Sequence, residues 1–441
     1  MAFGSSFESQ ARGLYLATPL AQATNVTSTF AWLDHDESER RKMLEVVDLF
    51  REKGTLDELG FGVIRDTFAD YFFPGTSTIQ TRARYFLFLP WIYLKLEAER
   101  VTTAHVDQQA RRWQAQLARA LAAGGQGEPA GVIGVQAGER LQRPPSVVYW
   151  SGMRRWGIRI FPGSLEQYHL AFDNLTADAR RGLRSDDGEG ELVEASRRNW
   201  HGGLPAAPEG LFEAATFDLT REEALYLQER VLTSVPGTML AYLVQGGRHI
   251  RRVQAPWLYP QLDRLPQILR DRLEQARKFS ILAIGAQYLY NLMMAEKAVT
   301  DGIKDETELI DRYRARLLEW SSEVRQETAS FRAWHRPGFW ALVYELNPAL
   351  RPPAYRFAEA WMTMAIEDPA RVAERQDARQ LIAAREGSLK GGLARLQSRR
   401  ALERWNGASG LGRLTFRWPE GRMMAADILD GLASKEEQAI A

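Results

Sequence analysis

Two stretches of the sequence place arginines beside hydroxyl and amide side chains, a combination that suits the binding of phosphate groups. The first, FFPGTSTIQTRARYFLFLPWIY, occupies residues 72–93. Pro74 and Gly75 interrupt the chain before a run of polar residues that ends at Arg82 and Arg84. Backbone N–H groups at a helix start, hydroxyls and guanidinium groups together predict an anion site here.

The same residues also fit a purely structural role. Thr76, Ser77 or Thr78 could cap the helix that follows. Arg65 or Arg82 could pair with a nearby carboxylate, and the candidates are Asp57, Glu58, Asp66 and Asp70. A buried ion-pair network of this kind would give the same sequence pattern, so both interpretations stay open.

The second stretch, AGERLQRPPSVVYWSGMRRWGIR, occupies residues 137–159 and concentrates positive charge. Five arginines and one glutamate between Gly138 and Ile160 give a local net charge of +4, whereas the whole chain has a formal net charge of +1. A short helix, a tight turn at QRPP, a second helix that Ser146 could cap and an extended GIRIF follow one another. This order predicts a helix-turn-helix segment over residues 137–160 that could carry a wing.

A helix-turn-helix presents one face of its second helix to nucleic acid. Arginines on that face would contact phosphate, and hydroxyl side chains would reach base edges or backbone. We therefore predict these nucleic-acid-binding residues: Ser146, Tyr149, Ser151, Arg154, Arg155 and Arg159, together with Arg82 and Arg84 from the first stretch. A docking surface for another protein and a packed scaffold helix are the alternative interpretations.

Motifs for several enzyme classes are absent from the sequence. The chain contains no cysteine, which excludes thiol nucleophiles and cysteine-ligated metal sites. It lacks the GxxxxGK(S/T) phosphate loop and the GxSxG nucleophile motif. Its six histidines are scattered without metal-ligand spacing. We predict neither a cofactor nor a metal, and the alternative is a nuclease or hydrolase whose carboxylates come from distant segments.

Charge and hydropathy patterning predict a cytoplasmic protein without a membrane partner. Positive and negative side chains are nearly balanced, at 57 and 56, so any contact with nucleic acid must come from a local patch. The N-terminal residues lack a basic region followed by a sustained apolar run, as a secretory signal would have. The longest apolar stretch, YFLFLPWIYL, contains Pro90 and is far shorter than the roughly 20 residues that span a bilayer.

The elements that must position these residues are predicted to be helices. The fold class is mostly α, a two-part helical protein with the helix-turn-helix segment in its N-terminal half. A polar, glycine-rich stretch over residues 177–210 predicts a linker or mobile loop between an N-terminal domain (1–176) and a C-terminal domain (211–441). A long surface loop within one domain is the alternative.

Helical periodicity supports this fold class along most of the chain. Helices are predicted over residues 34–54, 56–73, 105–124, 220–234, 263–299, 305–335 and 367–405. The acidic DHDE at the start of the first suits helix capping better than metal ligation. Only WGIRIF and GLGRLTFRW are typical of strands.

Four segments resemble an uncharacterised bacterial domain-of-unknown-function family, and the similarity extends through essentially the whole chain. They are TLDELGFGVIRDTFADYFFPGTSTIQTRARYFLFLPWIY, RPPSVVYWSGMRRWGI, KFSILAIGAQYLYNLMMAE and LIAAREGSLKGGLARL. The resemblance carries over no catalytic residue. It implies a genomic setting in phage-defence islands, near helicases and phospholipase-D-like nucleases, and hence an accessory subunit.

These patterns together predict a non-enzymatic accessory component of a bacterial DNA-transaction or antiphage defence system. It would bind nucleic acid, DNA first of all, or dock a helicase or nuclease partner. A metal-dependent nuclease or hydrolase and a purely structural scaffold subunit are the alternatives.

Overall fold

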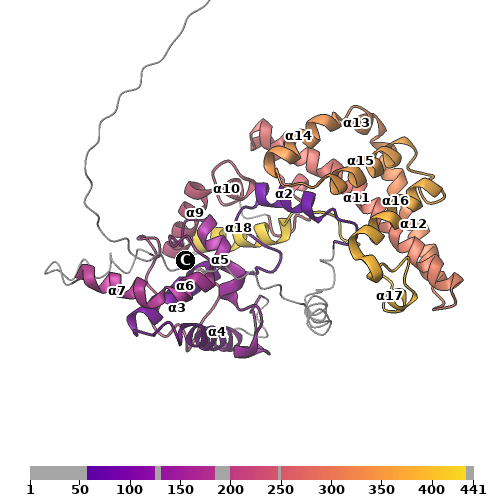
Figure 1. The fold of residues 1–441 in the computed structure, drawn as a ribbon. Helices are drawn as coiled ribbons and strands as arrows, with labels where there is room; N and C mark the ends of the chain where they lie inside the picture. Colours follow the sequence, from indigo (N-terminus) through magenta and orange to yellow (C-terminus); the bar gives the residue numbers. More distant parts are fainter. Residues whose placement is uncertain (1–56, 125–130, 184–198, 247–249, 434–441) are drawn as a thin grey trace, which may run out of the picture. The chain divides into compact units, whose positions relative to one another are not determined.

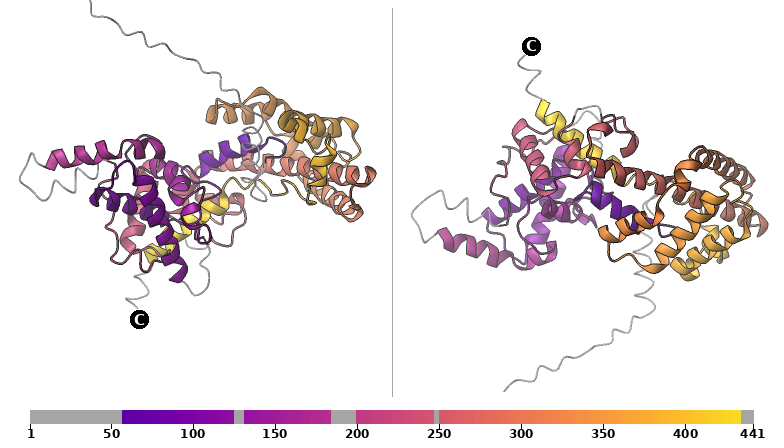
Figure 2. Two further views of the ribbon diagram at one scale, coloured as in Figure 1. Left: turned by 60° about the horizontal axis from the view of Figure 1, so that its bottom comes forward. Right: turned by 90° about the horizontal axis from the view of Figure 1, so that it is seen from above.

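The computed structural model describes residues 57–124, 131–183, 199–246 and 250–433. All of them lie in the compact unit Gly54–Ala441. Helices and connecting loops make up the described residues, and no strand occurs among them (Figure 1, and from two further directions in Figure 2). The structure thus confirms the mostly α fold class.

The two predicted strands are wrong. WGIRIF contributes only one isolated antiparallel bridge, between Arg159 and Trp200. GLGRLTFRW is a loop that leads into a helix beginning at Trp418. An extended segment becomes a strand only when a neighbouring segment offers a ladder of backbone N–H and C=O partners. No described segment does so for either stretch.

The first half of the described chain contains short and medium helices, in which η denotes a 3₁₀ helix. They are α2 (Gly62–Phe72), α3 (Tyr85–Ala98), α4 (Val106–Ala123), η1 (Gly138–Arg140), α5 (Pro145–Arg155), α6 (Leu165–Leu170), α7 (Phe172–Leu183), α9 (Arg221–Ser234) and α10 (Met239–Leu243). Helix α3 packs against α4 and α5, which brings the two stretches singled out in the sequence together (Figure 1).

The second half is built around one long helix. Its elements are η2 (Pro256–Leu258), η3 (Leu262–Arg264), α11 (Gln267–Thr300), α12 (Thr307–Gln326), α13 (Thr328–Arg332), α14 (Arg336–Leu346), α15 (Pro352–Glu367), α16 (Gln376–Lys390), η4 (Gly391–Leu393), α17 (Arg399–Glu403) and α18 (Trp418–Ala433). Helix α11 runs without interruption for 34 residues. It packs against α12, α15 and α16, while α18 packs against α9.

Tryptophans fix the packing around α11. Trp320 on α12 donates its indole N–H to the carbonyl of Ile281 at 2.7 Å, and Trp361 on α15 donates to the carbonyl of Leu282 at 2.8 Å. Both rings are at most 2% exposed. A buried indole needs an acceptor for its N–H, so these two bonds set the rotation of α12 and α15 on α11.

Several helix ends lie close to their predicted positions. Thr220 caps α9, and its hydroxyl accepts from the Glu223 N–H while the Glu223 side chain accepts from the Thr220 N–H. Helix α2 ends at Phe72, just before the Pro74–Gly75 break. Helix α4 coincides with the predicted 105–124 segment.

The predicted hydroxyl caps in the two arginine-rich stretches are wrong. Helix α3 begins only at Tyr85, after Arg84, so Thr76 and its neighbours form a loop. Helix α5 begins at Pro145, whose ring favours the first helical position. Ser146 is therefore already inside the helix, and its backbone N–H donates to the side-chain oxygen of Gln114 at 2.8 Å.

Some expectations fall on residues outside the described ranges. These are the helix over 34–54 with its DHDE start, and residues 184–198 of the predicted 177–210 linker. The division of the chain into an N-terminal and a C-terminal helical domain stays a prediction.

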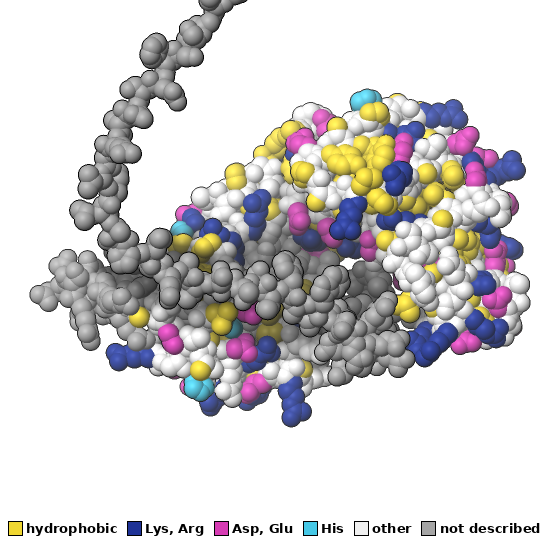
Figure 3. Space-filling model, viewed as in Figure 1, with side chains coloured by type: hydrophobic (Ala, Val, Ile, Leu, Met, Phe, Trp, Pro, Cys, Tyr) yellow, Lys and Arg dark blue, Asp and Glu magenta, His cyan; other side chains and the backbone are white. Residues whose placement is uncertain are grey.

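The described surface mixes both signs of charge. On the face that Figure 3 shows, Lys and Arg side chains lie among Asp and Glu side chains, in keeping with the near-zero net charge. Within the described ranges, no helix is long and apolar enough to cross a membrane.

Candidate functional site

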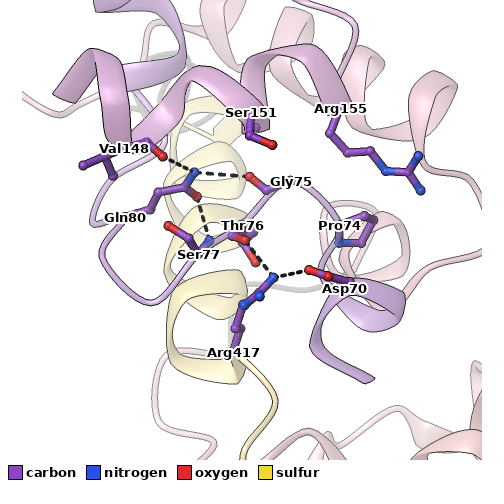
Figure 4. A pocket seen from close by; sticks show the side chains of 11 residues that line it. Asp70, Pro74, Gly75, Thr76, Ser77, Gln80, Val148, Ser151, Arg155 and Arg417 are labelled. Atoms are coloured by element: carbon purple, nitrogen blue, oxygen red, sulfur yellow. Dashed lines mark hydrogen bonds and ion pairs between the residues drawn. The ribbon is translucent and has the colours of Figure 1, made fainter. Parts of the chain in front are cut away.

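A pocket of about 490 Å³ lies between the loop before α3 and the outer side of α5 (Figure 4). It unites residues from both arginine-rich stretches. Its lining consists of Asp70, Pro74, Gly75, Thr76, Ser77, Gln80, Val148, Ser151, Gly152, Arg155 and Arg417. The volume falls in the range of about 300–1,000 Å³ that is typical of small-molecule sites.

The loop over residues 73–80, which we call the PGTS loop, forms one wall. Gly75 has φ +84°, a conformation that side-chain-bearing residues rarely adopt. The Gln80 amide donates to the carbonyls of Gly75 at 3.2 Å and Val148 at 3.3 Å, and its oxygen accepts from the Ser77 N–H. The Thr76 hydroxyl donates to the Phe73 carbonyl at 2.7 Å. These bonds occupy Gln80 and Thr76, so both side chains shape the loop.

Helix α5 forms the opposite wall and approaches the loop closely. A Cβ atom on Gly152 would overlap with the Gly75 carbonyl oxygen, so only glycine allows this contact. The indole N–H of Trp156 donates to the Pro74 carbonyl at 2.9 Å. The geometry of the pocket therefore depends on Gly152 of α5 and on Trp156, which directly follows the last residue of α5.

The residues of α5 divide cleanly between core and solvent. Val147, Ser151, Arg154 and Arg155 are exposed, whereas the helix residues between them are buried. Their spacing places all four on one face of the helix. We call this set the α5 face.

Two arginines of the α5 face lack an acidic partner. Arg154 donates to the Ile160 carbonyl at 2.9 Å, and neither Arg154 nor Arg155 forms an ion pair with any described residue. Arg417, on the far side of the pocket, is paired with Asp70 and donates to the Thr76 carbonyl at 2.9 Å. Arg155 is thus the cation at the pocket whose charge is not offset locally (Figure 4).

Two serines add hydroxyl groups to the same space. The Ser77 hydroxyl oxygen is buried and has no hydrogen-bond partner among the described residues. Ser151 is exposed on α5 and lines the pocket from the other side (Figure 4). A buried hydroxyl normally finds a partner, because leaving it unpaired costs about 1–3 kcal/mol. Ser77 therefore lines the pocket and carries a hydroxyl that no described residue uses.

Three other predicted site residues of the second stretch are buried. Tyr149 is fully enclosed, and its hydroxyl accepts from the Thr81 N–H at 2.8 Å and donates to the Arg82 carbonyl at 3.0 Å. Burial raises the pKa of Tyr149 to about 12, so the phenol stays protonated. Ser146 is 2% exposed and Arg159 is 3% exposed. These three side chains are part of the packed interior and are not accessible to a ligand at the surface.

Arg159 is held inside by carbonyl groups. Its guanidinium donates to the Trp150 carbonyl at 3.2 Å and the Gly163 carbonyl at 2.8 Å, and lies over the Trp150 ring. Burial, with a smaller contribution from Arg154, lowers the pKa of Arg159 to about 10. It remains a cation at neutral pH, but its donors are committed to the chain.

Arg82 and Arg84 belong to ion pairs. Arg84 bonds Glu223 of α9 at 2.7 Å, and both side chains are less than 10% exposed. Arg82 bonds Asp427 of α18 at 2.9 Å. Arg82 and Arg84 therefore have the structural role that was considered for the first stretch. Their partners are not the nearby carboxylates considered in the sequence analysis, because Glu223 and Asp427 are distant in the sequence. Arg65 does pair with Asp66, as considered above.

The expected helix-turn-helix segment is represented by η1, the QRPP turn and α5. The first of these elements has only three residues. Assignment of this segment to a helix-turn-helix stays a prediction, and the features that carry the site are the α5 face and the pocket beside it.

Sequence reasoning missed a buried ionic network elsewhere. Lys390 contacts Glu58, Glu386 and the hydroxyl of Tyr290, and Arg395 donates to Glu58 at 3.0 Å. Burial by itself would raise the pKa of Glu58, but Lys390 and Arg395 outweigh it and lower that pKa. The network joins three of the four segments that carry the family resemblance. The only signal in the sequence was that these segments contain glutamate, tyrosine, lysine and arginine residues.

A metal site needs several carboxylate or histidine side chains close together. No group of three or more His, Asp or Glu side chains there could hold a metal ion. A further small pocket of about 170 Å³ includes Asp218, Asp427 and Asp430, but it also includes Arg82 and Arg251.

One comparison with known proteins gives a match. The family described as "Family of unknown function (DUF6361)" matches residues 27–433. No curated protein and no solved structure matches the chain.

Proposed function

The chain belongs to the DUF6361 family of unknown function, and we propose that it binds nucleic acid through the α5 face. Arg154 and Arg155 would contact phosphate groups of the backbone, and Ser151 would add a hydrogen bond. DNA is the preferred ligand. The observation that carries the proposal is the adjacency of two exposed arginines without acidic partners, in a chain whose net charge is only +1.

Three arginines of the first stretch and of the pocket are neutralised. Arg82 and Arg417 each pair with an aspartate, and Arg84 pairs with a glutamate. An arginine that keeps its full charge at the surface attracts phosphate and gains a bidentate contact there. Two such residues at successive positions of one helix, one turn from an exposed serine, are side chains of the types that contact a phosphate backbone.

The wider role that we propose is that of a cytoplasmic, non-enzymatic accessory component of a DNA-transaction or antiphage defence system. The resemblance described in the sequence supports this setting by association alone. In such a system the α5 face would hold the nucleic acid while a separate helicase or nuclease acts on it.

The decisive experiment measures binding of the purified protein to labelled double-stranded and single-stranded DNA across a series of salt concentrations. We expect affinity to fall steeply with salt, because neutralised phosphates release their counterions. No binding at the lowest salt concentration would overturn the proposal. The same samples incubated with Mg²⁺ or Mn²⁺ test for cleavage, and metal-dependent cleavage by the pure protein would favour a nuclease instead.

A further inference from the structure

We infer that the pocket beside the α5 face binds a phosphate monoester carried by a nucleoside. The source is either the phosphorylated end of a nucleic-acid strand or a free nucleotide. For the strand end, the inference rests on the proposed function, because the α5 face would hold the rest of the strand.

The size of the pocket favours a ligand larger than a phosphate ion. A volume of about 490 Å³ is large for a phosphate ion and suits a ligand that carries further atoms. The internal phosphodiesters of a strand lie along a protein surface and do not need a cavity. A terminal nucleotide can leave the path of the strand and enter one, with its sugar against the apolar atoms of Pro74 and Val148.

The polar groups of the pocket suit a monoester. Its phosphate has three terminal oxygens and carries between one and two negative charges near neutral pH. Arg155 and Ser151 line the pocket on the side of α5, and Ser77 lines it on the side of the PGTS loop (Figure 4). The Ser77 hydroxyl is buried and forms no hydrogen bond with any described residue, so it could donate one to a phosphate oxygen.

The local charge also favours an anion. Asp70 is the one carboxylate in the lining, and its side chain is 68% exposed and bonded to Arg417. The Nε of Arg417 is buried without a partner in the described chain. Asp70 thus offsets Arg417, and Arg155 leaves the pocket with a net charge of about +1 before a ligand arrives.

The test uses the full-length protein and three probes. Two are the same single-stranded oligonucleotide, labelled at its 3′ end, with either a phosphate or a hydroxyl at its 5′ end. The third is a nucleoside 5′-monophosphate, measured by calorimetry and as a competitor. The variants are Ser77→Ala and Ser77→Thr, with Ser388→Ala on the exposed side of α16 as a control. Removing an unpartnered hydroxyl should leave folding intact, which thermal unfolding verifies.

We expect the 5′-phosphate oligonucleotide to bind about tenfold more tightly than the 5′-hydroxyl one. Hydrogen bonds to a charged phosphate are strong enough to give a difference of this size. Ser77→Ala should remove this preference, while Ser77→Thr and Ser388→Ala keep it. A nucleotide that binds in a Ser77-dependent way, with no preference between strand ends, would also support the inference and identify the free nucleotide as the source.

The failures of the two proposals are distinguishable. Salt-dependent DNA binding with equal affinity for both ends, and no binding of the nucleotide, would overturn the pocket inference alone. Nucleotide binding that requires Ser77, without binding of any oligonucleotide, would support the pocket and overturn the α5-face proposal. A preference for phosphate that persists unchanged in Ser77→Ala would overturn the assignment to this pocket.

Discussion

The indole of Trp156, just past the end of α5, contacts both the PGTS loop and helix α3. Its N–H donates to the Pro74 carbonyl at 2.9 Å, and its ring stacks on Phe86 of α3 with 3.9 Å between the ring centroids. The ring is fully buried. Because α5 carries the exposed arginines and α3 follows the loop, Trp156 and the close approach of Gly152 to Gly75 together set the distance between α5 and the loop.

Gly75 should be intolerant of any side chain. Its φ is +84°, and a Cβ atom would lie 2.6 Å from the Trp156 Nε1 atom. We expect Gly75→Ala to reduce the free energy of unfolding by about 1–3 kcal/mol or more, measured by chemical denaturation. Gly237→Ala is the matched control, since Gly237 has φ +72° and no neighbouring atom within 4 Å of a Cβ. Equal losses in both variants would show that backbone strain alone is responsible, without the contact to Trp156.

Tyr149 should matter for stability through its hydroxyl group. Tyr149→Phe leaves the partly buried N–H of Thr81 without its acceptor and the Arg82 carbonyl without its donor. We expect a loss of about 1–3 kcal/mol in the free energy of unfolding. Tyr344→Phe, at an exposed position, should change stability by less than about 0.5 kcal/mol. If Tyr149→Phe were as mild as this control, the hydrogen bonds of Tyr149 would not stabilise the loop.

The Arg84–Glu223 pair should be far more sensitive to single than to double substitution. Arg84→Met leaves a buried carboxylate unpaired, which costs about 3–5 kcal/mol. The double variant Arg84→Met/Glu223→Gln removes both charges and keeps an acceptor for the Thr220 N–H, so it should recover part of this loss. Urea denaturation of the two single variants and the double variant measures the coupling. Additive losses would mean that the pair contributes no interaction of its own.

The Glu58 network should produce a pH-dependent stability. Its folded-state pKa lies below the ordinary value of 4.5, so the stabilisation is present above that value and is lost as the pH falls through the lower folded-state pKa. We expect Glu58→Gln to be less stable than the wild type by about 1–3 kcal/mol at neutral pH. The difference should shrink as the solution is acidified below pH 4.5. A difference that stays constant or grows on acidification would contradict this assignment.

Removal of both exposed arginines of the α5 face should change the salt dependence of DNA binding in a defined way. Each phosphate contact contributes about 0.9 to the slope of log affinity against log salt for duplex DNA, so Arg154→Ala/Arg155→Ala should reduce the slope by roughly 1.8. The control Arg325→Ala/Arg332→Ala removes the same charge from exposed positions on α12 and α13. An equal reduction in both variants would indicate a diffuse charge effect and not a contact at α5.

The sequence by itself determined the helical nature of the protein. Apolar spacing predicted α4, α9 and α11 with nearly correct ends, because this signal acts over a few neighbouring residues. The positive character of the second stretch was equally visible. The sequence patterns of WGIRIF and GLGRLTFRW could not show whether either segment forms a strand, however. A strand requires a second segment that pairs with it, and that segment is not visible in the local sequence.

Only the tertiary structure decided which polar residues are available. Arg84 and Arg155 look alike in the sequence, yet Glu223, 139 positions away, neutralises the first and no described carboxylate reaches the second. Tyr149 and Ser151 are two residues apart, and the packing of α5 on α3 buries one and exposes the other. Composition fixes which charges and hydroxyls a chain possesses, whereas long-range packing selects which of them keep a free donor at the surface.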